Sequence, residues 1–68
     1  MKSLTRREFE IMNFIREGYT DKQIARMLCL SKYTIASHTS NIFRKLHVQN
    51  RTHAINLLFL KKKEKVHL

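Results

Sequence analysis

The spacing of apolar residues along the chain predicts a series of short helices separated by polar turns. In the first stretch, the apolar residues that share one helix face are Ile11, Met12 and Ile15. Thr5 and Glu8 stand three residues apart, as in a capping box, and Gly18 suits the left-handed conformation that ends many helices. The pattern therefore predicts a first helix over residues 6–17.

The same start and stop signals predict a short second helix and a longer third helix. Thr20 and Gln23 repeat the capping-box pattern and place the second helix over residues 21–28. The apolar spacing is then interrupted, and Ser31 is a suitable N-cap for a third helix over residues 32–45. Only a short turn separates these two helices.

The third helix is predicted to have two chemically different faces. Its inward face is expected to carry Ile35, Ile42 and Leu46, with a half-buried His38 on the same line between them. Its opposite face carries small or hydrogen-bonding side chains, namely Lys32, Tyr33, Ala36, Ser37 and Ser40. A helix face that meets only water usually carries many Glu and Lys residues, so this surface indicates a contact with another molecule.

A fourth helix is predicted over residues 51–60, followed by a basic tail over residues 61–68. Its apolar residues lie almost all round the helix: Ala54, Ile55, Leu57, Leu58, Phe59 and Leu60. We expect Ala54, Ile55 and Leu58 to face the core. The remaining three, Leu57, Phe59 and Leu60, are then available to a partner. The alternative is that Phe59 and Leu60 fold back over the first helix.

Composition narrows this picture to one small all-α domain, residues 1–68. The chain has no Pro and one Gly, which disfavours a sheet with many tight hairpins. Hydrophobic residues make up 43% of the 68 residues, enough for a core despite the formal charge of +9. We therefore expect a four-helix domain that contains a helix-turn-helix.

The composition also argues against several classes of function. One Cys rules out an intrachain disulfide, and the four His residues show no spacing typical of a metal site. There is no glycine-rich loop or carboxylate cluster, so we expect no catalytic residues, no metal, no cofactor and no enzyme activity. No apolar run is long enough to span a membrane and no apolar signal core follows Met1, so a cytoplasmic protein is expected.

The positive charge and the short turn before the third helix together favour a nucleic-acid partner. The major groove of DNA, about 12 Å wide, admits one helix when the leading face of that helix carries small side chains. Two alternatives remain open at this point. One is a helical bundle whose basic residues are merely solvated. The other is a basic amphipathic module that binds a protein or a membrane surface through the fourth helix and the tail.

Four segments of the chain share a pattern that extends over about residues 4–60. They are Leu4-Thr5-x-Arg7-Glu8-x-Glu10-Ile11-Met12, Gly18-Tyr19-Thr20-Asp21-Lys22-Gln23-Ile24-Ala25, Leu28-Cys29-Leu30-Ser31-x-x-Thr34-Ile35, and His38-x-x-Asn41-Ile42-x-x-Lys45-Leu46-x-Val48-x-Asn50-Arg51-Thr52-x-Ala54. In this order, without a gap, they closely resemble the LuxR/FixJ/GerE-type helix-turn-helix domain. The resemblance implies a scaffold helix, a recognition helix in the major groove, and a fourth helix that joins two domains on a two-fold DNA site.

The resemblance also implies a role for individual positions. Base-facing residues are Lys32, Tyr33, Ala36, Ser37 and Ser40. Phosphate contacts are expected from Thr20, Lys22, Thr34, His38, Lys45 and Arg51. Contact between two copies is expected from Leu57, Phe59 and Leu60. Because the base-facing set holds little charge, we expect the cations to supply affinity and the small polar residues to supply specificity.

The function that the resemblance implies is sequence-specific binding of double-stranded DNA by a transcriptional regulator. The chain is then a stand-alone regulator or the output domain of a response regulator from a two-component system, with RNA polymerase as a candidate further partner. A promoter-recognition domain of a sigma factor is the alternative within this class.

Two residues depart from simple expectations for a small helical domain. Glu8 lies on the apolar face of the first helix, so we expect it to pair with Arg51 or with another buried cation. His47 stands where the family usually has Gly, at the end of the third helix. A residue with a side chain is strained in a left-handed conformation, so this turn is expected to be strained or built differently.

Overall fold

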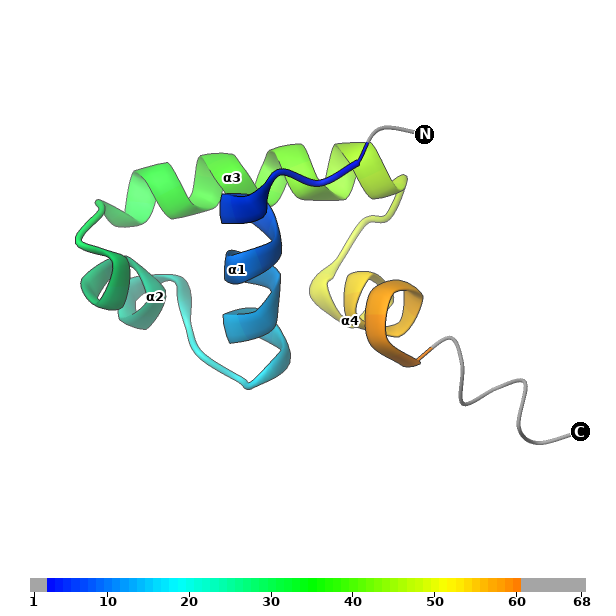
Figure 1. Cartoon of the computed structure of the whole chain (residues 1–68), viewed down its shortest axis with the longest axis horizontal. Helices are drawn as coiled ribbons and strands as arrows, with labels where there is room; N and C mark the ends of the chain where they lie inside the picture. Colours follow the sequence, from blue (N-terminus) through cyan, green and yellow to red (C-terminus); the bar gives the residue numbers. More distant parts are fainter. Residues whose placement is uncertain (1–2, 61–68) are drawn as a thin grey trace, which may run out of the picture.

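The computed structural model describes residues 3–60, and this part of the chain is all-helical, as the sequence predicts. Its elements are α1 (Arg6–Arg16), α2 (Asp21–Leu28), α3 (Lys32–Leu46), α4 (Arg51–Ile55) and a π-helical segment, η1 (Asn56–Leu60), that continues α4. Figure 1 shows α3 along the length of the domain, with α2, α1 and α4 arranged side by side beneath it. The basic tail predicted over residues 61–68 lies outside the described residues.

The helices begin at the capping residues that the sequence indicates. In α1, the Thr5 hydroxyl accepts a hydrogen bond from the Glu8 amide at 3.1 Å, and Glu8 Oε1 accepts one from the Thr5 amide at 2.9 Å. Thr20 and Gln23 exchange the equivalent bonds in α2, at 3.2 and 2.9 Å. These side chains satisfy amides that have no partner inside the helix. The N-cap residues of α3 and α4 are Ser31 and Asn50.

Three turns between the helices use the left-handed region of the backbone. Gly18 has a φ of 96°, as expected for the residue that follows α1. His47 and Cys29 both have a φ of 58° at the ends of α3 and α2. A residue with a Cβ in this conformation costs about 1 kcal/mol or more. The strain expected at His47 is therefore confirmed, whereas the same conformation at Cys29 was not predicted.

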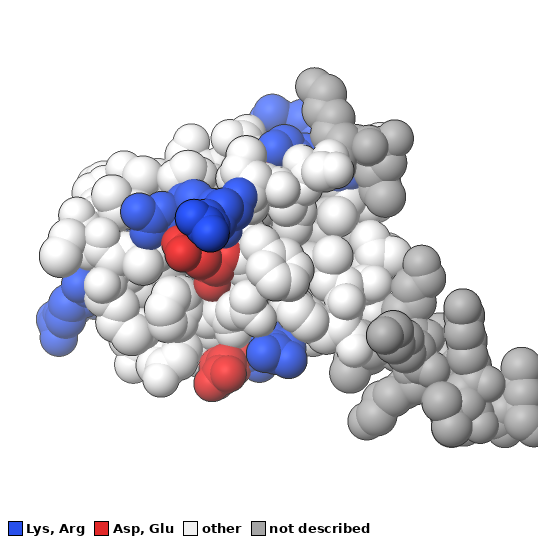
Figure 2. All heavy atoms as spheres, in the orientation of Figure 1, with Lys and Arg blue, Asp and Glu red and all other residues white. Residues whose placement is uncertain are grey.

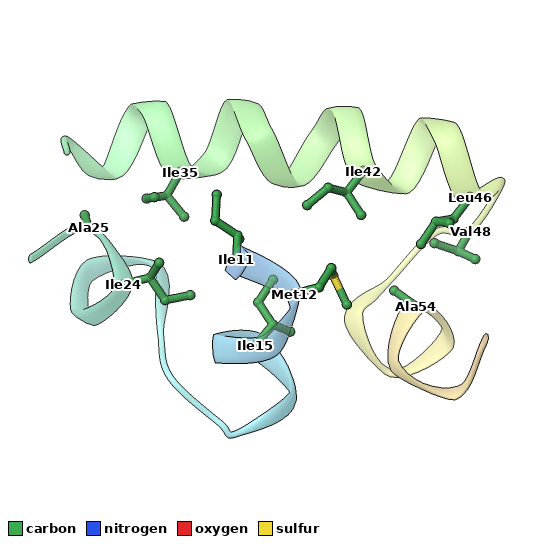
Figure 3. Packing of buried hydrophobic residues seen from close by; sticks show 10 residues of the cluster. All are labelled: Ile11, Met12, Ile15, Ile24, Ala25, Ile35, Ile42, Leu46, Val48 and Ala54. Carbon is green, nitrogen blue, oxygen red and sulfur yellow. The ribbon is translucent and has the colours of Figure 1, made fainter. Parts of the chain in front are cut away.

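The core is a single layer of apolar side chains between α3 and the three helices beneath it. Figure 3 shows Ile35 and Ile42 of α3 pointing toward Ile11 and Met12 of α1. At one end of the layer α2 contributes Ile24 and Ala25, and at the other the cluster is closed by Leu46, Val48 and Ala54. A layer of this kind holds α3 by one side only and leaves its other side exposed to water.

The inward face of α3 differs from the prediction at one position. Thr39, with 8% of its surface exposed, is buried together with Ile35 and Ile42, whereas His38 is only half-buried. Both positions lie within one helical turn of Ile35 and of Ile42, so apolar spacing alone does not separate them. The other helices cover the side of α3 that carries Thr39, so the burial of Thr39 was missed, whereas the half-buried position expected for His38 is confirmed.

The end of the fourth helix packs against α1. The rings of Phe59 and Phe9 lie with their centroids 6.0 Å apart, and the Arg16 guanidinium carbon lies 4.5 Å from the centroid of Phe59. The alternative in which Phe59 folds back over the first helix is thereby confirmed. Leu57 is half-buried against the core, and the side chain of Leu60 is outside the described set. A contact between two copies through these residues stays a prediction.

Candidate nucleic-acid interface

The amino-terminal half of α3 presents all five predicted base-facing residues to solvent. Tyr33 is the most exposed large hydrophobic residue in the described part of the chain, with 78% of its surface accessible. The ammonium nitrogen of Lys32 lies 6.0 Å from the centroid of the Tyr33 ring, at the outer limit of a cation–π contact. Exposed small side chains follow in the next two turns, at Ala36, Ser37 and Ser40. No acidic side chain belongs to this set of five.

An open groove of about 730 Å³ lies beside this face, where the amino ends of α2, α3 and α4 meet. Six residues that the sequence assigns to DNA contact line it: Thr20, Lys22, Lys32, Tyr33, Ala36 and Arg51. Predicted phosphate-binding and base-facing residues from three helices are thus brought together. The other predicted site residues, Thr34, Ser37, His38, Ser40 and Lys45, are not part of its lining.

An ion pair inside the groove was not foreseen from the sequence. Arg51, the first residue of α4, donates a hydrogen bond from Nη2 to Oδ1 of Asp21, the first residue of α2. The side chains are 39% and 31% exposed, so both are held against the protein and still reach solvent. A carboxylate is also favoured at the start of a helix by the helix dipole. The pair is 30 residues apart in the chain, which is why local sequence patterns gave no sign of it.

Two hydroxyls assigned to phosphate contact are already engaged in helix capping. The Thr20 hydroxyl accepts from the Gln23 amide and lies 3.3 Å from Gln23 Oε1. The Thr34 hydroxyl lies 3.0 Å from that of Ser31, which caps α3. Lys22, in contrast, is exposed. Phosphate contacts by these side chains stay predictions.

Glu8 and Lys45 form the ion pair that joins α1 to α3. The Lys45 ammonium lies 2.8 Å from Glu8 Oε1, and the Glu8 residue is only 4% exposed. The predicted pairing of Glu8 with a cation is confirmed, but the partner is Lys45, and the proposed pairing with Arg51 was wrong. Lys45, near the carboxyl end of α3, thus contacts the first turn of α1, whereas the Arg51 guanidinium is bound by Asp21.

The environment of Glu8 shifts its protonation in a definite direction. Burial alone raises the pKa of the carboxyl group. The hydrogen bond from Lys45, the backbone hydrogen bond from Thr5 and the positive charge of Lys45 outweigh that effect, so the pKa of Glu8 lies below its ordinary value of 4.5. Glu8 is therefore held as a carboxylate with a structural role, and the Lys45 charge is partly committed to it.

Positive charge is not gathered into one continuous patch on the face shown in Figure 2. Lys and Arg side chains appear there in several separate groups, and two of these groups lie directly beside Asp or Glu. On this face, the basic residues are therefore partly balanced within the protein itself. The formal charge of +9 belongs to the whole chain and overstates the charge of this face.

Two further observations concern residues 3–60 only. Within this range, no group of three His, Cys, Asp or Glu side chains is placed so that it could hold a metal ion. The helices in this range include none with the length and apolar character needed to cross a membrane.

Comparison with known proteins adds evidence of a different kind. A family model described as bacterial regulatory proteins, luxR family, matches residues 2–58. Over 53 residues, the chain is 45% identical to the probable csgAB operon transcriptional regulatory protein of Salmonella typhimurium. The aligned region covers 78% of this chain and 24% of that protein. The chain is 43% identical over 56 residues to the response regulator protein VraR of Staphylococcus aureus, with 82% and 27% covered.

A solved structure agrees with these matches. The crystal structure of the response regulator ChrA, from a heme-sensing two-component system, has a TM-score of 0.83 and 34% identity to this chain. The match covers 91% of this chain and 31% of ChrA. The chain thus spans about a quarter of the length of the curated relatives named above, and about a third of ChrA.

Proposed function

The chain belongs to the luxR family of bacterial regulatory proteins, and from this premise we propose that it is the DNA-binding domain of a transcriptional regulator. The observation that carries the proposal is the exposed amino-terminal half of α3, which stands beside a groove formed by the amino ends of three helices. Two relatives named above are a transcriptional regulatory protein and a response regulator, which supports the same class of function.

In the proposed mode of binding, α3 enters the major groove of double-stranded DNA with its amino-terminal half. Ala36 contacts a thymine methyl group or lets the helix approach the bases closely, because its side chain is a single methyl. Tyr33, Ser37 and Ser40 offer hydroxyls to base edges, directly or through water. Specificity therefore comes from the neutral side chains of this face.

Phosphate contacts are assigned to the residues around the groove. The capping box of α2 engages the Thr20 and Gln23 amides, whereas the amides of Asp21 and Lys22 have no partner inside the helix and are available to a phosphate oxygen. Lys22 and Arg51 lie at the same edge and add positive charge. Thr20, which also lines the groove, and Thr34, His38 and Lys45, which lie outside its lining, complete the proposed set. Each phosphate neutralised makes the affinity fall more steeply as salt is added.

We further propose that two copies bind a two-fold DNA site through the fourth helix. Two domains of this kind contact half-sites about one helical turn apart. Leu57 and Leu60, together with the outer edge of Phe59, are the residues assigned to the contact between copies. We assign the domain no enzymatic activity and no cofactor, a cytoplasmic location, and RNA polymerase as a further partner.

Selection of binding sites from random-sequence duplexes tests this function. The purified chain is expected to enrich one sequence with two-fold symmetry, and its affinity is expected to fall steeply with the logarithm of salt concentration. Binding of all duplexes with equal affinity at physiological salt, or an affinity independent of salt, contradicts the proposal.

Substitutions on the exposed face of α3 test the source of specificity. Ser37→Ala and Tyr33→Ala are each expected to lower discrimination at one or two base pairs of the selected site by about 1–3 kcal/mol, while the salt dependence stays the same. The matched control is Ser3→Ala, which removes an exposed serine hydroxyl that lies outside α3. A repeated selection measures the preference. An unchanged preference in both α3 variants contradicts the assignment of these residues to base contact.

A further inference from the structure

We propose that Asp21 is a positioning residue for DNA binding, which holds the Arg51 guanidinium so that its remaining N–H groups face a phosphate. The inference rests on the proposed function and adds a residue that the sequence did not assign to the site. In this role the acidic side chain of Asp21 favours binding to a polyanion, which is the opposite of the effect that the charge of Asp21 alone predicts.

The first support is the geometry of the pair. Asp21 begins α2 and Arg51 begins α4, and Figure 1 shows these two helices on either side of α1. The hydrogen bond from Arg51 Nη2 to Asp21 Oδ1 therefore fixes a long side chain across the groove. A guanidinium has five N–H donors, so the bond to one carboxylate leaves others available to a second acceptor.

The second support is the surroundings of the pair. Lys22 and Lys32 line the same groove, so a phosphate placed there meets two further cations. About a third of each paired side chain is exposed, so Arg51 can contact a ligand without leaving Asp21. An arginine already oriented in this way loses less side-chain entropy when it binds.

A simple charge argument predicts the opposite outcome. Asp21 carries a negative charge next to the place assigned to a phosphate, and removing that charge should tighten binding if Asp21 acts by its charge alone. If Asp21 acts through Arg51, its removal should weaken binding because the guanidinium loses its orientation. The sign of the effect therefore separates the two accounts.

The experiment compares the affinities of four chains, alongside the further variants Glu17→Gln and Asp21→Glu, for a fluorescent duplex of about 20 base pairs, two helical turns, at several salt concentrations. The four are the unaltered chain, Asp21→Asn, Arg51→Gln and the double variant. Glu17→Gln is the matched control, because it removes one exposed carboxylate from the end of α1, outside the pair. Melting curves set an assay temperature at which every variant is folded.

Asp21→Asn is expected to weaken binding by about eightfold at about 0.1 M salt and to lower the salt slope by about 0.9, the amount due to one phosphate contact. Asp21→Glu keeps the carboxylate and is expected to bind as the unaltered chain does. In the Arg51→Gln background, Asp21→Asn is expected to tighten binding, since only repulsion is then removed. Glu17→Gln is expected to leave the slope unchanged.

Tighter binding by Asp21→Asn in both backgrounds, with an unchanged salt slope, overturns the positioning role of Asp21. Equal weakening in both backgrounds also overturns it, because Asp21 then acts without Arg51. If the unaltered chain itself shows no salt-dependent affinity for the duplex, the proposed function fails, and this result is distinct from either outcome for the variants.

Discussion

At the scale of single residues, Thr39 is the side chain whose environment fits it least. It is buried on the inward side of α3, and its hydroxyl oxygen has no hydrogen-bond partner among the described residues. A buried polar group without a partner costs about 1–3 kcal/mol. Valine has nearly the same shape as threonine and carries a methyl group in place of the hydroxyl.

We therefore predict that Thr39→Val raises the free energy of unfolding by about 1 kcal/mol, because valine keeps the branched shape and removes the unsatisfied hydroxyl. Urea-induced unfolding followed by circular dichroism measures the change. The control is Thr52→Val, at an exposed position of α4, where the effect is expected to stay within about 0.5 kcal/mol. A lower stability for Thr39→Val would show that its hydroxyl has a partner after all.

At the scale of elements, the contact between α1 and α3 depends on the charge of Glu8. Its carboxylate closes the capping box of α1 and also accepts from Lys45 of α3. Because the pKa of Glu8 is lowered in the folded protein, the carboxylate stabilises the fold above its ordinary pKa of 4.5, and this stabilisation is lost as the pH falls through the lowered value.

Glu8→Gln is expected to lower the free energy of unfolding by about 1–2 kcal/mol at neutral pH, with the capping box retained. The difference between the unaltered chain and the variant is expected to shrink as the pH is lowered toward about 3. Unfolding curves at a series of pH values measure it. Glu10→Gln, in an exposed pair with Arg7, serves as the control and should show almost no difference. If the difference in the free energy of unfolding between the unaltered chain and Glu8→Gln stays constant or grows at low pH, the Glu8 charge does not stabilise the fold as proposed.

The elements also show which parts of the fold and site could be predicted from the sequence. Helix starts were predicted well because Thr5, Thr20 and Ser31 act on amides only two or three residues away. The partners in the ion pairs were not predicted, because the Asp21–Arg51 and Glu8–Lys45 pairs depend on how separate helices pack. The sequence indicated that Glu8 needs a cation but could not choose which one.

The exposed face of α3 could be predicted from the sequence for a different reason. Its residues differ in chemistry from an ordinary solvated helix face, and this difference is visible in the sequence before any packing is known. Burial at Thr39 was missed because helical spacing places it and His38 equally close to the apolar residues of α3. Only the position of the neighbouring helices decides between them.

At the scale of the whole molecule, the domain combines a one-sided core with an uncovered recognition surface. The core residues of α3 pack against α1, α2 and α4, and the opposite side of α3 is left for a ligand. The charge of +9 provides general attraction to a polyanion, while the neutral face of α3 is where specificity is proposed to arise. The matched region makes up about a quarter of the length of the curated relatives.

Contact between DNA and the exposed amino-terminal half of α3 is the feature on which the proposed function depends. Amide chemical-shift changes in the isotope-labelled chain, recorded by nuclear magnetic resonance as the selected duplex is added, test it most directly. We expect the largest changes over residues 32–40 and at the start of α2, residues 20–22, with small changes in the middle of α1. Changes centred on α1 and η1, with the signals of residues 32–40 unmoved, would contradict it.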